Sequence, residues 1–315
     1  MKKTFFTRAV PLALAAAVCC INIPVSASDS EGVQDAYGIP EHVTEDFPGA
    51  EDSLQIDADV TELPDAVYTG TLTFVDIPIE KGKELYGDPD RWKPSDSFKD
   101  DGECLEYEGE ENVRLFTNPN IHYFALDTPI SEQEVPESEM ITEEQAREMA
   151  EEAVGLLGVN ARILGRFGQD SDLEGVYSYI LGGTIDGTLV SSSSPVWSKG
   201  SVEITGSHYS YVYYSCNYEP EQREEVRLLD FSEILEKVAV YAKAGYIQEP
   251  GSGESVTRIS LEYYVEEQTD GLVFYPVWNF QVSSLLGDGA FMFGKEMDDL
   301  FYIDAQTGML VKSMA

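Results

Sequence analysis

Two amphipathic helix patterns, each followed by strand-like segments, constrain the fold more than any other feature of the sequence. The first begins with Thr142 as N-cap and Gln145 three residues later, the spacing of a capping box. Its apolar residues recur on one helical face until Gly158, where we expect the helix to end. The second begins at Asp230, with Glu233 as the reciprocal partner. Because such a helix buries only one face, each should pack on a sheet formed by the strands that follow it.

The segments after the helices alternate between apolar and polar residues, as strands with one buried face do. The clearest example is Thr257–Glu266, after which a turn at Gln268–Gly271 leads into the aromatic-rich strand Leu272–Val282. Another strand-like run extends from Val202 to Tyr214, and a hairpin between Leu300 and Lys312 comes last. We therefore predict an α+β fold of antiparallel sheets, each with a packed helix. The repeated order suggests two such modules in tandem.

The first residues have the pattern of a secretory signal peptide. Three basic residues precede an apolar stretch from Ala9 to Ile23, and Val25-Ser26-Ala27 places small residues where a signal peptidase cleaves. We predict removal of residues 1–27, secretion, and no transmembrane anchor in the mature chain. Cys19 and Cys20 lie within the apolar stretch, so a lipid-anchored cell-surface protein is the alternative.

The mature chain divides into four regions by composition and pattern. Residues 28–53 are acidic and contain several Gly and Pro residues, which predicts a flexible tether. We expect a small N-terminal α+β region at residues 54–135, with a short helix near Ile79–Tyr86. A helix-plus-sheet module should follow at 136–229, and a second such module at 230–315.

The chain is strongly acidic, with 58 Asp and Glu against 20 Lys and Arg and a formal net charge of −38. Removal of the basic signal peptide makes the mature chain more acidic still. Such a surface repels nucleic acid, which we exclude as a partner, and it favours cations and basic protein surfaces. A simpler interpretation is that the charge only keeps an exported protein soluble.

The mature chain retains two cysteines, Cys104 and Cys216. An even number in an oxidising compartment permits one disulfide between them, although the sequence does not place them within bonding distance. One bond in so long a chain is not a disulfide scaffold. A hydrophobic core must therefore supply most of the stability.

No motif for catalysis or metal binding stands out. The histidines (His42, His122 and His208) lie outside any metal-binding or general-base pattern, and no Gly-x-Ser-x-Gly nucleophile elbow occurs. Asp170–Gly175 opens like a calcium loop, but Leu181 stands where the loop needs a carboxylate. We predict a non-enzymatic binding or regulatory protein with no metal or cofactor. A secreted hydrolase using paired carboxylates is the alternative: with 58 acids some pair can lie close together, although the number of acids does not by itself make a pair catalytic.

The most distinctive candidate contact residues are Tyr209, Tyr211 and Tyr213, which alternate along one predicted strand. Residues spaced by two lie on the same face of a strand. If the face of Val212 and Tyr214 packs inward, the three tyrosines face outward and form a contact surface for a protein or cell-envelope component. If the faces are reversed, the tyrosines belong to the core.

Short motifs in the later part of the chain resemble PepSY-type modules. The first helix carries Thr142, Ala146 and Ala150 in a Thr-x-x-x-Ala-x-x-x-Ala pattern, and the last hairpin reads Tyr-x-Asp-Ala-x-Thr-Gly from Tyr302 to Gly308. Tyr275–Phe280 is similar to the preceding strand in exported YycH- and YycI-type regulators and in uncharacterised secreted or lipid-anchored proteins of Gram-positive bacteria. The resemblance implies binding that restrains an extracytoplasmic protease or sensor kinase, without catalytic residues.

Overall fold

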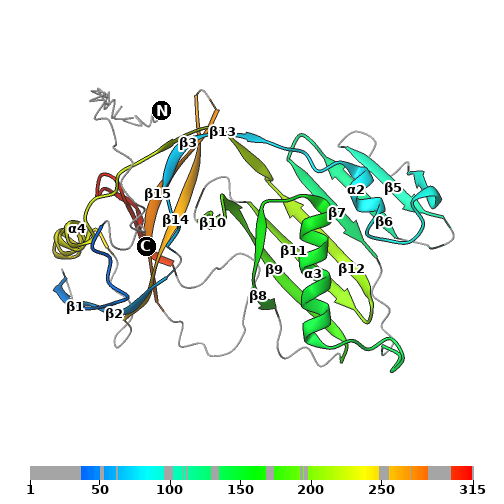
Figure 1. Cartoon of the computed structure of the whole chain (residues 1–315), viewed down its shortest axis with the longest axis horizontal. Helices are drawn as coiled ribbons and strands as arrows, with labels where there is room; N and C mark the ends of the chain where they lie inside the picture. Colours follow the sequence, from blue (N-terminus) through cyan, green and yellow to red (C-terminus); the bar gives the residue numbers. More distant parts are fainter. Residues whose placement is uncertain are drawn as a thin grey trace, which may run out of the picture. The chain divides into compact units, whose positions relative to one another are not determined.

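β-Strands account for 53% of the described residues and helices for 16%, and the strands form two large sheets (Figure 1). The predicted signal peptide, residues 1–27, lies outside the described residues. The structure is a computed structural model that describes residues 37–49, 53–61, 63–95, 102–108, 110, 113–128, 135–167, 174–191, 194, 198–247, 255–269, 271–282 and 299–313.

The first sheet combines strands from the beginning and the end of the described chain. Its main path runs in the order β1-β2-β14-β15-β16-β17, and β3 joins it by pairing with both β15 and β13. β2 and β14 are parallel, whereas the other pairs in this sheet are antiparallel. Its strands are β1 (His42–Pro48), β2 (Ser53–Thr61), β3 (Tyr68–Phe74), β13 (Tyr218–Glu225), β14 (Val256–Gln268), β15 (Gly271–Val282), β16 (Asp299–Asp304) and β17 (Leu310–Ser313).

The second sheet is formed by the middle of the chain and is antiparallel throughout. Its order is β10-β9-β11-β12-β7-β6-β5-β4, and β8 also pairs with β9. Its strands are β4 (Trp92–Pro94), β5 (Glu103–Tyr107), β6 (Arg114–Asn118), β7 (Tyr123–Asp127), β8 (Ala161–Phe167), β9 (Val176–Ile185), β10 (Thr188–Leu189), β11 (Lys199–Thr205) and β12 (His208–Ser215).

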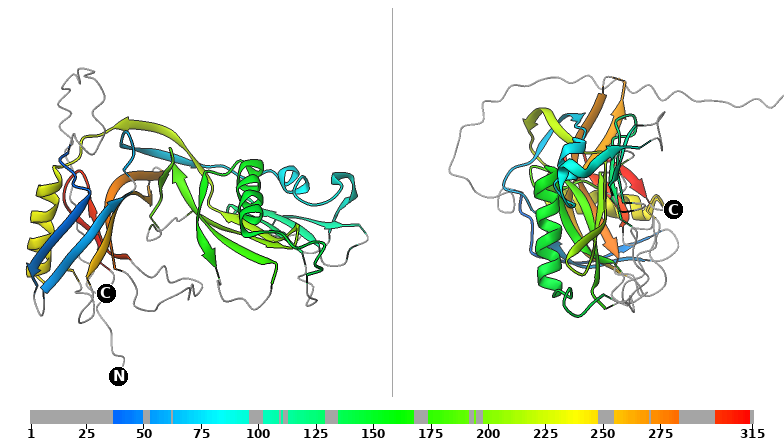
Figure 2. Two further views of the ribbon diagram at one scale, coloured as in Figure 1. Left: turned by 60° about the horizontal axis from the view of Figure 1, so that its bottom comes forward. Right: turned by 90° about the vertical axis from the view of Figure 1, so that its right-hand side faces the viewer.

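One long helix packs on each sheet: α4 on the first and α3 on the second (Figure 2). The predicted capping box of α3 is confirmed, because Oγ1 of Thr142 accepts a hydrogen bond from the Gln145 N–H at 3.2 Å and Oε1 of Gln145 accepts one from the Thr142 N–H at 2.9 Å. Among the described residues, no helix has the length and apolar character needed to cross a membrane. The helices are α2 (Ile79–Lys83), the 3-10 helix η1 (Pro89–Arg91), α3 (Glu143–Leu157) and α4 (Phe231–Lys243).

The expected α+β fold with two tandem helix-and-sheet modules is wrong, because the chain is mostly β-strand. Strands from distant parts of the sequence pair with one another. β3 lies beside both β13 and β15, so each of the regions expected at 54–135, 136–229 and 230–315 contributes a strand to the first sheet. Alternation along a strand shows which face is buried but not which strand lies beside it. The tandem arrangement therefore rested on sequence order alone.

Part of the segment expected to be a flexible tether forms β1. Residues 42–48 pair with β2 along their whole length. Val43 and the preceding Ile39 are each only 4% exposed and contribute to the core between α4 and the first sheet. Two well-placed apolar residues thus anchor a segment whose overall composition is acidic.

Hydrogen bonds to the backbone of β14 join the two sheets beyond the end of β10. Val190 forms a parallel bridge with Tyr263 of β14, and the Ser191 N–H donates to the Tyr263 carbonyl at 2.7 Å. Oγ of Ser194 accepts a hydrogen bond from the Val265 N–H at 2.9 Å. These bonds fix the β9–β10 hairpin against the first sheet.

Candidate functional site

The three predicted contact tyrosines lie on two different faces of the second sheet. The pairing of β11 with β12 skips Ser210, which is an extra residue, or β-bulge, in β12. Because one extra residue reverses the alternation, Tyr209 faces α3, and its hydroxyl donates to the Met149 carbonyl at 2.9 Å. Tyr211 and Tyr213 face the opposite side. The bulge therefore leaves two of the three tyrosines on the outward face.

Tyr211 and Tyr213 lie with Phe116 and Tyr123 in a cluster that we call the aromatic face. The hydroxyl oxygens of Tyr123 and Tyr211 are 3.2 Å apart, and the ring centroids of Tyr123 and Tyr213 are 6.2 Å apart. Phe116 extends the cluster, with its ring centroid 5.9 Å from that of Tyr123. All four residues are partly exposed. The neighbouring strands β6, β7 and β12 thus present a continuous aromatic surface on the side away from α3.

Carboxylates flank the aromatic face at Tyr211. In the sheet register, Asp127 lies opposite Tyr211 on one side and Glu203 on the other. Oε1 of Glu203 accepts a hydrogen bond from the Ser210 hydroxyl at 3.0 Å, which fixes this carboxylate. Burial, the hydrogen bond with Tyr123 and the two carboxylates together raise the pKa of Tyr211 above its usual value. Tyr211 therefore remains a neutral phenol that can donate a hydrogen bond.

The predicted disulfide is not formed, and Cys104 and Cys216 are both free. Cys104 on β5 is in register with Phe116 on β6, Phe116 with Ala125 on β7, and Ala125 with Tyr213 on β12. Three strand spacings of about 4.8 Å place Cys104 roughly 14 Å from β12, the strand that Cys216 follows. A disulfide needs Cα atoms about 4.4–6.8 Å apart. Burial raises the pKa of both thiols, so both are poor nucleophiles.

The three histidines come from different parts of the fold. His42 lies on the surface between Asp59 at 2.8 Å and Asp57 at 2.9 Å, and these hydrogen bonds raise its pKa. Nδ1 of His122 is 3.0 Å from Asp76. The third histidine is exposed at the start of β12. Within the described part of the chain, no three His, Cys, Asp or Glu side chains are grouped so that they could hold a metal ion.

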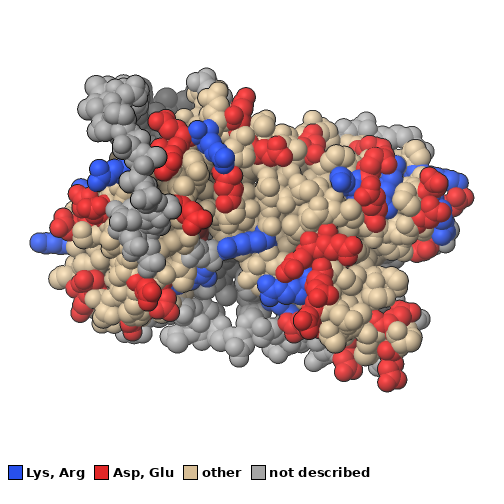
Figure 3. Space-filling model, in the orientation of Figure 1, with Lys and Arg blue, Asp and Glu red and all other residues tan. Residues whose placement is uncertain are grey.

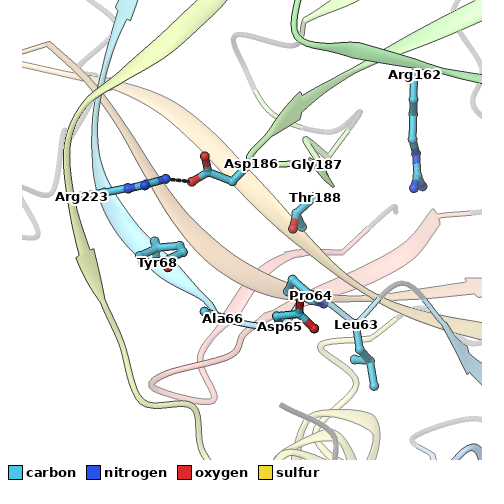
Figure 4. Close-up of a pocket in the computed structure, with 10 residues that line it drawn as sticks. All are labelled: Leu63, Pro64, Asp65, Ala66, Tyr68, Arg162, Asp186, Gly187, Thr188 and Arg223. Carbon is cyan, nitrogen blue, oxygen red and sulfur yellow. Dashed lines mark hydrogen bonds and ion pairs between the residues drawn. The ribbon is translucent and has the colours of Figure 1, made fainter. Parts of the chain in front are cut away.

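A cleft of about 530 Å³ opens where the β9–β10 hairpin approaches β3 and β13 (Figure 4). The hairpin turn consists of Asp186 and Gly187, whose φ angles of 50° and 82° are those of a type I′ turn. This turn points Asp186 at Arg223 of β13, and Nη1 of Arg223 donates to its carboxylate. The cleft is lined by Leu63, Pro64, Asp65, Ala66, Tyr68, Arg162, Asp186, Gly187, Thr188 and Arg223.

Sequence reasoning missed this cleft. The Asp-Gly pair is a hairpin signal that could have placed Asp186 on a turn. No signal, however, links that turn to Arg223 or Tyr68, because these residues come from strands of the other sheet. Their juxtaposition depends on the pairing of β3 with β13, which joins two distant parts of the sequence.

Comparison with known proteins identifies a similar fold but no family. No protein-family model matches the chain, and no curated protein matches it. The resemblance to PepSY-type and YycH-type proteins therefore remains a prediction. The chain is similar to the crystal structure of an uncharacterized protein from Eubacterium rectale ATCC 33656, with a TM-score of 0.56 and 14% sequence identity. The match covers 88% of this chain and 94% of that one, and at this identity it shows a shared fold only.

Proposed function

We propose that this is an exported, non-enzymatic binding protein whose aromatic face contacts a protein partner outside the cytoplasm. The aromatic face carries the proposal, because it presents Phe116, Tyr123, Tyr211 and Tyr213 together on the sheet side away from α3. Tyrosine suits a contact surface, since it offers a large contact area and a hydroxyl at a low cost in conformational entropy. Such a surface would let an exported protein bind a partner directly through its sheet.

A basic protein surface is the partner chemistry that fits best. Asp127 and Glu203 border Tyr211, and the whole chain has a formal net charge of −38. On the side of the molecule that carries α3, acidic side chains are spread over the whole surface, with patches of basic ones between them (Figure 3). Long-range attraction would therefore steer a basic partner toward the protein, and the tyrosines would supply the short-range contact.

A binding role is better supported than a carboxylate hydrolase. A hydrolase of that kind needs one carboxylic acid kept protonated near neutral pH, usually by burial. The cleft contains Asp65 and Asp186, but both residues are exposed and Asp186 forms an ion pair with Arg223. Restraint of an extracytoplasmic protease or sensor, which the resemblance implies, is one form that this binding could take.

The test is affinity capture from the cell envelope with the mature protein and a variant carrying both Tyr211→Ser and Tyr213→Ser. We expect the wild-type protein to capture a basic partner and the double variant to lose it. Tyr246→Ser is the matched control, because Tyr246 is 66% exposed beyond α4 and far in sequence from the aromatic face. The control should capture the same partner as the wild type.

Thermal melting of each variant separates contact from folding. Loss of capture with an unchanged melting temperature supports the proposal. Capture of the same partner by the double variant would refute it. A large drop in melting temperature in the double variant alone would show that the tyrosines stabilise the sheet instead. Because attraction between charges is screened by salt, capture should also weaken as ionic strength rises.

A further inference from the structure

The cleft beside the β9–β10 hairpin has the size and walls of a small-molecule site. Its volume of about 530 Å³ falls within the usual range for ligand pockets. One wall is the segment of residues 63–66, which precedes β3. The other walls are the β9–β10 turn, β8 and β13. These elements belong to both sheets. A ligand in the cleft would therefore contact the two halves of the fold at once.

The charges in the cleft differ from those of the rest of the chain. The described residues that line it include two arginines and two aspartates, whereas acids outnumber bases by 58 to 20 in the whole sequence. Arg223 and Asp186 form an ion pair at one side, and Arg162 extends into the cleft from β8 at another (Figure 4). Asp65 lies at a third position. Positively and negatively charged side chains thus line the same cleft.

The remaining walls suit the uncharged part of a ligand. The guanidinium carbon of Arg223 lies 4.9 Å from the ring centroid of Tyr68, so the ion pair with Asp186 and this stacking fix both side chains. Leu63, Pro64 and Ala66 add apolar surface beside Tyr68. The Tyr68 N–H donates to the buried hydroxyl of Tyr263 at 3.0 Å, which holds this wall in place.

We propose that the cleft binds a small zwitterion of the class of an amino acid or a short peptide. Arg162 would bind its carboxylate, since a guanidinium offers paired donors that match a carboxylate. Asp65 would bind its ammonium group, and Tyr68 would contact the body of the ligand. A purely anionic ligand would be repelled by the aspartates of the cleft, and a purely cationic ligand by its arginines. This site is separate from the aromatic face, so either proposal can fail without the other.

The test is calorimetric titration of the mature protein with tri-alanine, N-acetyl-tri-alanine, tri-alanine amide and inorganic phosphate. We expect saturable binding of tri-alanine, and binding about tenfold weaker for each blocked peptide because each loses one charged contact. Arg162→Gln and Asp65→Asn should each weaken tri-alanine binding by a similar factor. Arg227→Gln is the control, since Arg227 is exposed and does not line the cleft.

The blocked peptides keep the test decisive even if a variant folds poorly, because they use the unaltered protein. Absence of tri-alanine binding at millimolar concentration would overturn the proposal. Equal binding of free and blocked peptides would also overturn it, as would phosphate binding at least as tight as that of tri-alanine. If Arg162→Gln folds and binds tri-alanine as the wild type does, the assignment of the carboxylate to Arg162 is wrong.

Discussion

Gly70 is the residue on which the pairing of β3 with β13 depends most directly. It lies opposite Arg223 in the register, and a Cβ at this position would be 2.0 Å from the Gln222 carbonyl oxygen and 2.9 Å from the Cα of Arg223. Both contacts involve backbone, so no side-chain rotation can relieve them. Gly70→Ala must therefore displace one strand from the other. We expect it to destabilise the protein by about 1–3 kcal/mol, the usual cost of overpacking.

Urea unfolding of the mature protein measures this cost, with Gly155→Ala as the matched control. Gly155 lies on the exposed side of α3, and a Cβ there would meet nothing within 4 Å. Because alanine favours helix more than glycine does, the control should gain about 0.5–1 kcal/mol. Opposite signs for the two Gly→Ala changes support the strand pairing described above. A Gly70→Ala variant as stable as the wild type would refute it.

Three further predictions follow from individual residues. His42→Gln should lower stability at pH 6 but not at pH 9. Its hydrogen bonds to two aspartates raise the pKa of His42. The stability that these bonds add is therefore complete below the unfolded-state pKa and is lost as the pH rises through the folded-state pKa. Urea unfolding midpoints measured across pH test this. Thiol titration of the unfolded, unreduced protein should find Cys104 and Cys216 both free, and fewer than two thiols would contradict the strand order. Intact mass of the exported product should show cleavage after Ala27, whereas a lipid adduct would establish the anchored form.

The local elements were the most predictable part of the fold. The helix expected from Thr142 to Gly158 is α3, and Gly158 ends it with a φ of 69°. The strands expected at Thr257–Glu266 and Leu272–Val282 correspond to β14 and β15. Caps and alternation depend on neighbouring residues in the chain, so the sequence carries them directly.

The arrangement of the strands could not be predicted in the same way. The run expected from Val202 to Tyr214 is in fact two strands, because Gly206 adopts a φ of 58° and turns the chain between β11 and β12. Because of the bulge at Ser210, Tyr209 lies on the sheet face that packs against α3. Neither feature changes the average composition of the segment, yet together they decide which tyrosines a partner could reach.

Site-specific photo-cross-linking at position 213 tests the proposed function most directly. A photoreactive phenylalanine analogue replaces Tyr213 in one strain and Tyr209 in another, and each protein is irradiated in intact cells. Tyr213 belongs to the aromatic face, whereas the hydroxyl of Tyr209 bonds to α3. We predict an adduct with a basic protein partner from position 213 and none from position 209. No adduct at 213, or equal adducts at both positions, would contradict the account.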